Sequence, residues 1–95
     1  MALKTVPFDP VEFLKTPEDV AAYLEEAFAS GDPAFVASAL GDAARAQGMS
    51  KVAADTGLSR ESLYRSLSKD GNPELATVMK VITALGVRLK PVELA

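Results

Sequence analysis

Four neighbouring side chains carry groups that can recognise the edge of a base pair. They are Arg60, Glu61, Tyr64 and Arg65, all on one side of a short segment at helical spacing. An arginine can donate two hydrogen bonds to O6 and N7 of a guanine, and a glutamate can accept one from N4 of a cytosine. Tyr64 offers a ring for a thymine methyl group and a hydroxyl for a phosphate. These residues predict direct readout of double-stranded DNA.

Hydroxyl and ammonium groups around this set are suited to hold a DNA backbone. Ser59 is expected to cap the helix and to lie with the base-reading residues. The alternative is that all of these side chains form an ordinary solvated surface, as most charged residues on short helices do. The residues expected to contact phosphates are Ser50, Lys51, Ser62 and Lys69.

The spacing around Gly57 predicts two short helices joined by a tight turn. Two helices cross closely when the turn residue tolerates a left-handed backbone and the crossing residues are small, and Gly57 and Ala53 meet both conditions. Leu58 and Leu63 would then fill the angle between the helices. We therefore expect a helix-turn-helix, with helices over about 50–56 and 60–67.

A polar residue followed by proline marks the start of each of three further helices. Thr16-Pro17, Asp32-Pro33 and Asn72-Pro73 predict helices over about 17–29, 33–47 and 73–85. Thr16 and Asp19 also have the spacing of a capping box.

Apolar residues at helical spacing predict the buried faces of these helices. Gly41 lowers the helix propensity of its segment by about 1 kcal/mol, and close packing of another helix would explain it. The residues predicted to be buried are Phe35, Val36, Ala39, Leu40, Ala43 and Ala44 in the 33–47 helix and Leu75, Val78, Met79, Ile82 and Leu85 in the last one.

Both ends of the chain have an extended character. Residues 87–92 alternate apolar and basic side chains, which is the period of a strand, and Pro91 would confine such a strand to an edge. Residues 3–8 could pair with this tail, with a second copy or with a partner's sheet edge. The predicted organisation is an extended segment 1–15, a single compact all-α domain of five helices over 16–86, and an extended tail 87–95.

The composition argues against catalysis. The chain of 95 residues contains no cysteine and no histidine, which removes cysteine nucleophiles, thiolate metal sites and the usual general base near neutral pH. Adjacent carboxylates such as Glu25 and Glu26 point apart on a helix and do not converge on a metal. We expect no enzyme activity, no cofactor and no metal. Without a signal peptide or membrane span, we expect a cytoplasmic location.

Charge is divided unevenly along the chain. Residues 1–43 hold two basic and eight acidic residues, a net charge of −6, whereas residues 44–95 hold eight basic and five acidic residues, a net charge of +3. The positive residues gather in the half that contains the predicted helix-turn-helix, where they favour a polyanion. The acidic half is suited to a different, basic partner.

Segment 50–64 resembles the helix-turn-helix of the lambda-repressor and Cro type, with Ala53, Gly57 and Leu63 at its small, glycine and apolar positions. The whole chain is similar to the addiction-module antidote family, the HigA-like antitoxins encoded beside small RelE- or HigB-like toxins. This resemblance covers roughly residues 8–90 and is carried by Phe8-Asp9-Pro10, Ala22-Tyr23-Leu24, Gly31-Asp32-Pro33, Ala39-Leu40-Gly41-Asp42-Ala43-Ala44-Arg45, Gly57-Leu58-Ser59-Arg60-Glu61-Ser62-Leu63-Tyr64 and Gly71-Asn72-Pro73.

The resemblance implies a lambda-repressor-like fold and an antitoxin that neutralises its toxin and represses its own operon. The chain has little room for the long disordered tail of many antitoxins, so the toxin would contact the acidic N-terminal segment or the C-terminal tail. One helix-turn-helix reads few base pairs, and we expect a symmetric homodimer on an inverted repeat. Two alternatives are a stand-alone phage-type repressor, and an interaction domain without DNA affinity, which the net charge of −3 favours.

Overall fold

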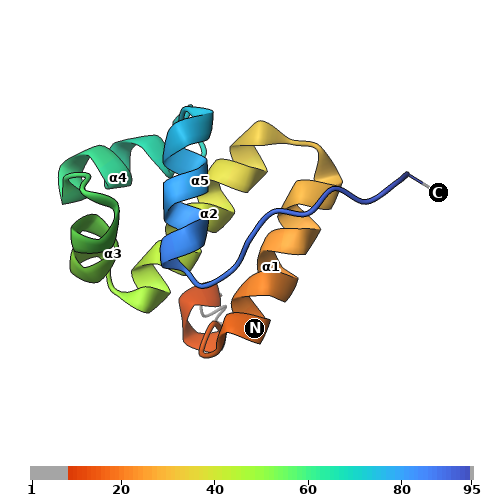
Figure 1. The fold of residues 1–95 in the computed structure, drawn as a ribbon, viewed down its shortest axis with the longest axis horizontal. Helices are drawn as coiled ribbons and strands as arrows, with labels where there is room; N and C mark the ends of the chain where they lie inside the picture. The colour runs from red at the N-terminus through yellow and green to blue at the C-terminus, as the bar shows by residue number, and fades with distance from the viewer. Residues whose placement is uncertain (1–8, 95) are drawn as a thin grey trace, which may run out of the picture.

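Helices account for most of residues 9–94, the part of the chain that the computed structural model describes (Figure 1). No strand is present among these residues, so the all-helical prediction with five α-helices is confirmed. The elements in chain order are the 3-10 helix η1 (Pro10–Phe13) and the α-helices α1 (Pro17–Ser30), α2 (Pro33–Gln47), α3 (Met49–Thr56), α4 (Arg60–Ser66) and α5 (Leu75–Ala84).

Side-chain caps define where α1 and α2 begin, as the sequence predicted. The Thr16 hydroxyl accepts a hydrogen bond from the backbone N–H of Asp19 at 3.1 Å, and the Asp19 carboxylate accepts one from the backbone N–H of Thr16 at 3.1 Å. Asp32 caps α2 by accepting from the backbone N–H of Ala34 at 3.0 Å. Each cap pairs a backbone donor that has no partner within its helix.

The predicted start of the last helix is wrong. Its first residue is Leu75, its N-cap is Glu74, and no side chain caps it, so Asn72 does not have the predicted role. Residues 67–74 lie outside any helix and carry the chain from α4 to α5. A side chain at Gly71 would collide with the backbone carbonyl of Ser66, which shows how closely this connection returns over the end of α4.

Part of the predicted burial is also wrong. Leu75 is 71% exposed and Met79 is 47% exposed, whereas Val81, outside the predicted stripe, is fully buried. Phe35 on α2 is likewise exposed. The apolar residues of α5 cover two adjoining faces of the helix, and the helical repeat alone does not tell which of them is buried. The neighbouring helices bury the face that contains Val81.

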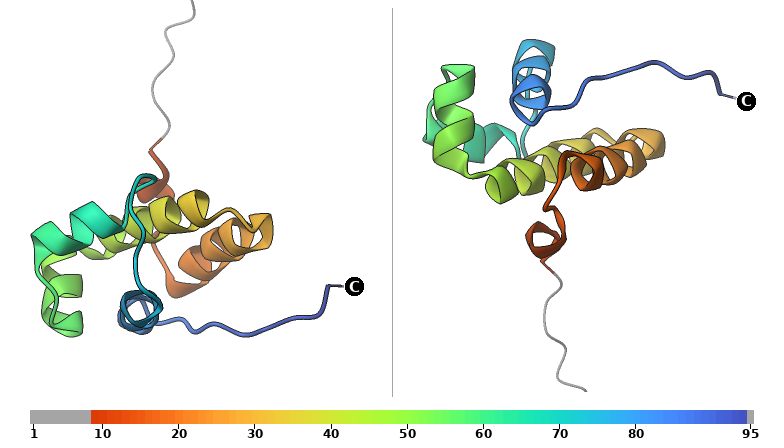
Figure 2. Two further views of the ribbon diagram at one scale, coloured as in Figure 1. Left: turned by 90° about the horizontal axis from the view of Figure 1, so that it is seen from above. Right: turned by 60° about the horizontal axis from the view of Figure 1, so that its bottom comes forward.

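The core forms around α2, which packs against η1, α1, α3, α4 and α5. Figure 2 shows α1 and the α3–α4 pair toward opposite ends of α2. A Cβ added at Gly41 would collide with the backbone carbonyl of Leu67, so the predicted close approach is confirmed, and the neighbour is the residue that ends α4. The largest fully buried side chains are Leu40, Val52, Leu63, Val81 and Ile82.

The segments flanking the bundle differ from the sequence-based expectation. Residues 10–13 form η1 and are not extended, because the Asp9 carboxylate caps them by accepting from the backbone N–H of Val11 at 3.1 Å. Residues 87–94 are extended but belong to no strand within the described chain (Figure 1). The proposed strand at 3–8 lies outside the described residues.

Candidate nucleic-acid interface

The turn between α3 and α4 is built on a glycine. Gly57 has a φ of +75°, in the left-handed region that residues with a Cβ rarely adopt, and its N–H donates to the Ala53 carbonyl at 2.9 Å. The Ser59 hydroxyl then caps α4 by accepting from the backbone N–H of Ser62 at 3.0 Å. Both predicted roles are confirmed, and together they set the direction in which α4 leaves the turn.

Apolar side chains hold α4 against the rest of the domain. Leu63 is fully buried, and Leu67, directly after the helix, is buried as well. Ala53 and Leu58 are partly buried and pack against the same core. The predicted packing of the two helices is therefore confirmed, and α4 is a short helix with one anchored face and one free face.

The free face of α4 carries the four predicted base-reading side chains. Arg60, Glu61, Tyr64 and Arg65 are all exposed. Neither arginine guanidinium makes a hydrogen bond or an ion pair with any residue between 9 and 94. Two unpaired guanidinium groups on one exposed helix face can accept a ligand that presents hydrogen-bond acceptors and negative charge.

The four predicted phosphate contacts are distributed around this face. Ser50 and Lys69 are exposed, and Ser62 is half-buried. Lys51 is exposed but paired, since its Nζ lies 2.7 Å from an oxygen of Asp55 one turn along α3. An exposed pair of this kind contributes little to stability, so Lys51 can exchange Asp55 for another anion at small cost.

Tyr64 and Lys69 also border a shallow depression between α2 and the end of α4. Asp42, Arg45 and Ser38 line its α2 side. Tyr64 therefore borders α2 while it remains on the exposed face of α4.

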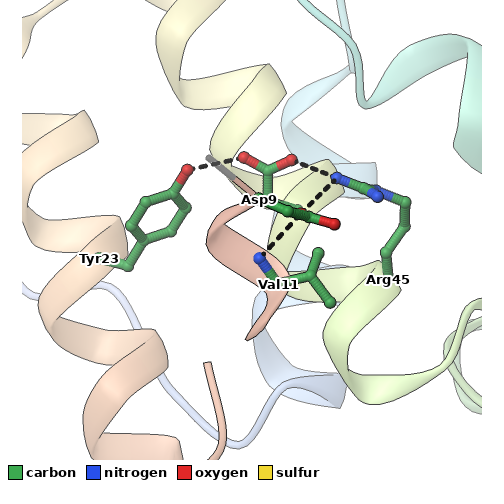
Figure 3. A network of polar contacts seen from close by, with 5 residues as sticks. Asp9, Val11, Tyr23 and Arg45 are labelled. Carbon is green, nitrogen blue, oxygen red and sulfur yellow. Dashed lines mark hydrogen bonds and ion pairs between the residues drawn. The ribbon is translucent and has the colours of Figure 1, made fainter. Parts of the chain in front are cut away.

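Sequence reasoning missed a polar network that joins η1, α1 and α2 (Figure 3). The Tyr23 hydroxyl donates to Oδ2 of Asp42 at 2.7 Å, and Nη2 of Arg45 donates to Oδ1 of the same carboxylate at 2.8 Å. Nη2 of Arg45 also lies 3.9 Å from Oδ1 of Asp9. The spacing of Asp42 and Arg45, three apart on one helix, was a usable signal, but nothing local indicated Tyr23 or Asp9.

This network changes the chemistry of the tyrosine. Burial raises the pKa of the Tyr23 hydroxyl, and its hydrogen bond to the negatively charged Asp42 raises that pKa further. Tyr23 is therefore a permanent neutral donor at physiological pH. Its role is to connect α1 to α2.

The acidic residues of the N-terminal half fall into two groups. The aspartates Asp9, Asp19, Asp32 and Asp42 each accept a hydrogen bond from the chain itself. The glutamates are exposed, and their side chains make no hydrogen bond or ion pair with the described residues. The acidic groups available to a partner are therefore Glu12, Glu18, Glu25 and Glu26.

Residues 9–94 contain no group of three or more acidic, cysteine or histidine side chains placed to hold a metal ion. No helix in this range has the length and apolar character needed to cross a lipid bilayer.

Comparison with known proteins identifies the family. A family model described as "Probable addiction module antidote protein" matches residues 4–93. The chain belongs to this antidote family. It is also 47% identical over 83 residues to an uncharacterized protein of Haemophilus influenzae, covering 87% of this chain and 86% of that protein. No solved structure matches the chain.

Proposed function

We propose that this protein is the antitoxin of a type II toxin-antitoxin system, and that it silences a small RelE- or HigB-like toxin and represses its own operon through α4. The observation that carries the DNA-binding part is the pair of unpaired, exposed guanidinium groups of Arg60 and Arg65 on a helix whose opposite face is anchored by Leu63. Family membership carries the antidote part.

In this proposal α4 enters the major groove of the operator. Its exposed arginines read guanines, Glu61 accepts from a cytosine and Tyr64 contacts a thymine methyl group or a phosphate. Ser59 lies at the N-terminus of the helix, where it can approach a base edge. Phosphate contacts come from Ser50, Lys51, Ser62 and Lys69. A homodimer presents two such helices to the halves of an inverted repeat.

The toxin is proposed to contact the acidic side of the molecule. A toxin that acts on RNA needs a basic surface for its substrate, and the exposed glutamates of α1 offer charges of the opposite sign that no residue between 9 and 94 neutralises. Glu18, Glu25 and Glu26 belong to α1, and α1 and the α3–α4 pair lie toward opposite ends of α2 (Figure 2). Toxin and operator can therefore be bound on separate surfaces.

Fluorescence anisotropy with a labelled duplex from the protein's own promoter tests the operator-binding claim. Arg60→Ala and Arg65→Ala should each weaken binding by about 5- to 150-fold, corresponding to about 1–3 kcal/mol per base contact, and should weaken binding to scrambled DNA far less. Arg88→Ala removes an exposed arginine outside the helix-turn-helix and is the matched control. A wild-type protein that shows no preference for its promoter at low salt would refute the claim and favour an interaction domain.

Co-purification with the neighbouring gene product tests the antidote claim. We expect a small protein to co-purify with the wild type. The same protein should bind more weakly to a variant in which Glu18, Glu25 and Glu26 are all replaced by alanine. Operator binding without any such partner would instead identify a stand-alone repressor.

A further inference from the structure

A pocket of about 300 Å³ lies where the turn between α1 and α2 meets α5 and the segment that connects α4 to α5. Its apolar walls include Phe28, Val36, Pro73 and Val78, and among its lining residues only Asn72 carries a polar side chain. A small polar ligand is held by several convergent polar groups, which this pocket lacks. Its surface is therefore suited to an apolar group.

Short contacts hold the walls of this pocket in place. The N–H of Gly31 donates to the Phe28 carbonyl at 3.1 Å and closes the turn between α1 and α2. The N–H of Gly71 donates to the Ser68 carbonyl at 2.8 Å, and a Cβ at Gly71 would collide with the Ser66 carbonyl. Because both walls are fixed, the pocket exists before a partner arrives, and binding there costs little reorganisation.

Exposed acidic side chains adjoin the pocket. Asp70 and Glu74 flank the lining segment 71–73, and Glu25 lies one turn before Phe28 on the surface of α1. The side chains of these three residues make no hydrogen bond or ion pair with residues 9–94. An apolar centre with an unpaired negative rim is complementary to a basic protein surface from which an apolar side chain projects.

We propose that this pocket and its acidic rim, defined by Glu25, Asp70 and Glu74, form the docking site for the toxin. The toxin inserts an apolar side chain into the pocket and places basic side chains on the rim. The inference rests on the proposed function, which supplies the partner through membership of the antidote family. It extends that function because the glutamates of α1 offer charge alone, whereas a buried apolar anchor carries much of the binding energy of a protein interface.

Surface plasmon resonance with the small protein encoded by the neighbouring gene tests the rim. Asp70→Lys and Glu74→Lys should each slow association about tenfold and make it less dependent on salt, because charges at the rim act mainly during approach. Asp55→Lys makes the same change on α3, which lies toward the opposite end of α2 from α1 (Figure 2), and is the matched control. Association that is unchanged in both rim variants would overturn the proposal.

Filling the pocket tests the apolar anchor. Val36→Phe places a ring in the pocket and should speed dissociation of the toxin about tenfold, because the loss of a buried contact acts mainly on the dissociation rate. Asn72→Trp fills the pocket from a segment outside any helix, so it remains informative if Val36→Phe fails to fold. Circular dichroism checks the fold of both variants.

The outcomes separate this inference from the proposed function. Folded pocket variants that bind and release the toxin as the wild type does would overturn the docking site and leave the proposed function intact. A wild type that binds no toxin would overturn both. A filled pocket that changes the oligomeric state in the absence of toxin would assign the pocket to a second copy and overturn the inference.

Discussion

Arg45 and the arginines of α4 have the same side chain in opposite surroundings. The Arg45 guanidinium contacts Asp42 at 2.8 Å and lies 3.9 Å from Asp9, whereas Arg60 and Arg65 have no partner among residues 9–94. In the N-terminal half, the aspartates likewise accept hydrogen bonds from the chain, whereas the glutamate side chains have no partner among residues 9–94. Groups that pair within the chain contribute to stability, and groups left unpaired at the surface are available for recognition. The stability of the fold and the recognition of a partner should therefore respond to different substitutions.

The largest expected effect comes from removing the anchor of α4. Leu63→Ala leaves a cavity at a fully buried position and should lower the free energy of unfolding by about 2–5 kcal/mol. Tyr64→Ala, the next residue, is half exposed and should change it by less than about 1 kcal/mol. Urea denaturation of the two variants measures the difference. Equal losses would contradict the division of α4 into an anchored and a free face.

A smaller loss is expected where α2 meets the end of α4. Gly41→Ala adds a methyl group that collides with the backbone carbonyl of Leu67, and we expect about 1–3 kcal/mol of destabilisation despite the better helix propensity of alanine. Ser38→Ala on the same helix, where no such collision arises, is the control. A Gly41→Ala protein as stable as the wild type would show that the two segments are free to separate.

The polar network should affect stability and leave operator affinity unchanged. Tyr23→Phe removes the hydrogen bond to Asp42 and should cost about 1 kcal/mol at neutral pH. Because the pKa of Tyr23 is raised in the folded state, its contribution is complete below the ordinary tyrosine pKa of about 10 and is lost at higher pH. The stability difference between variant and wild type should therefore shrink in alkaline solution. A fall in operator affinity at constant stability would contradict this separation of roles.

The smallest effect is expected at the start of α1. Backbone N–H donors of Lys15 and Thr16 lower the pKa of Asp19, so its carboxylate stabilises the fold above the ordinary pKa of about 4, and this contribution is lost as the pH falls through the lower folded value. Asp19→Asn should be less stable than the wild type at pH 7, and the two should converge as the pH falls below the lowered pKa of Asp19. Thermal denaturation at several pH values checks this. A gap that stays constant with pH would exclude the carboxylate as its cause.

Local chemistry determined much of this protein from the sequence alone. Thr16, Asp32 and Ser59 cap their helices through backbone groups two or three residues away, and Gly57 allows the left-handed turn. These interactions depend on near neighbours in the chain, which is why α1, α2 and the helix-turn-helix were predicted closely. The exposure of the four α4 side chains followed from the same helical period.

Only the tertiary structure decided which distant residues meet. Tyr23 and Asp42 are nineteen positions apart, and their hydrogen bond exists because α1 packs on α2. The late start of α5 and the exposure of Leu75 and Met79 depend on how residues 71–74 cross from α4, and a helical repeat carries no information about that path. Burial is a property of the assembled helices, so a pattern within one helix shows its apolar residues but not which of them the neighbours will cover.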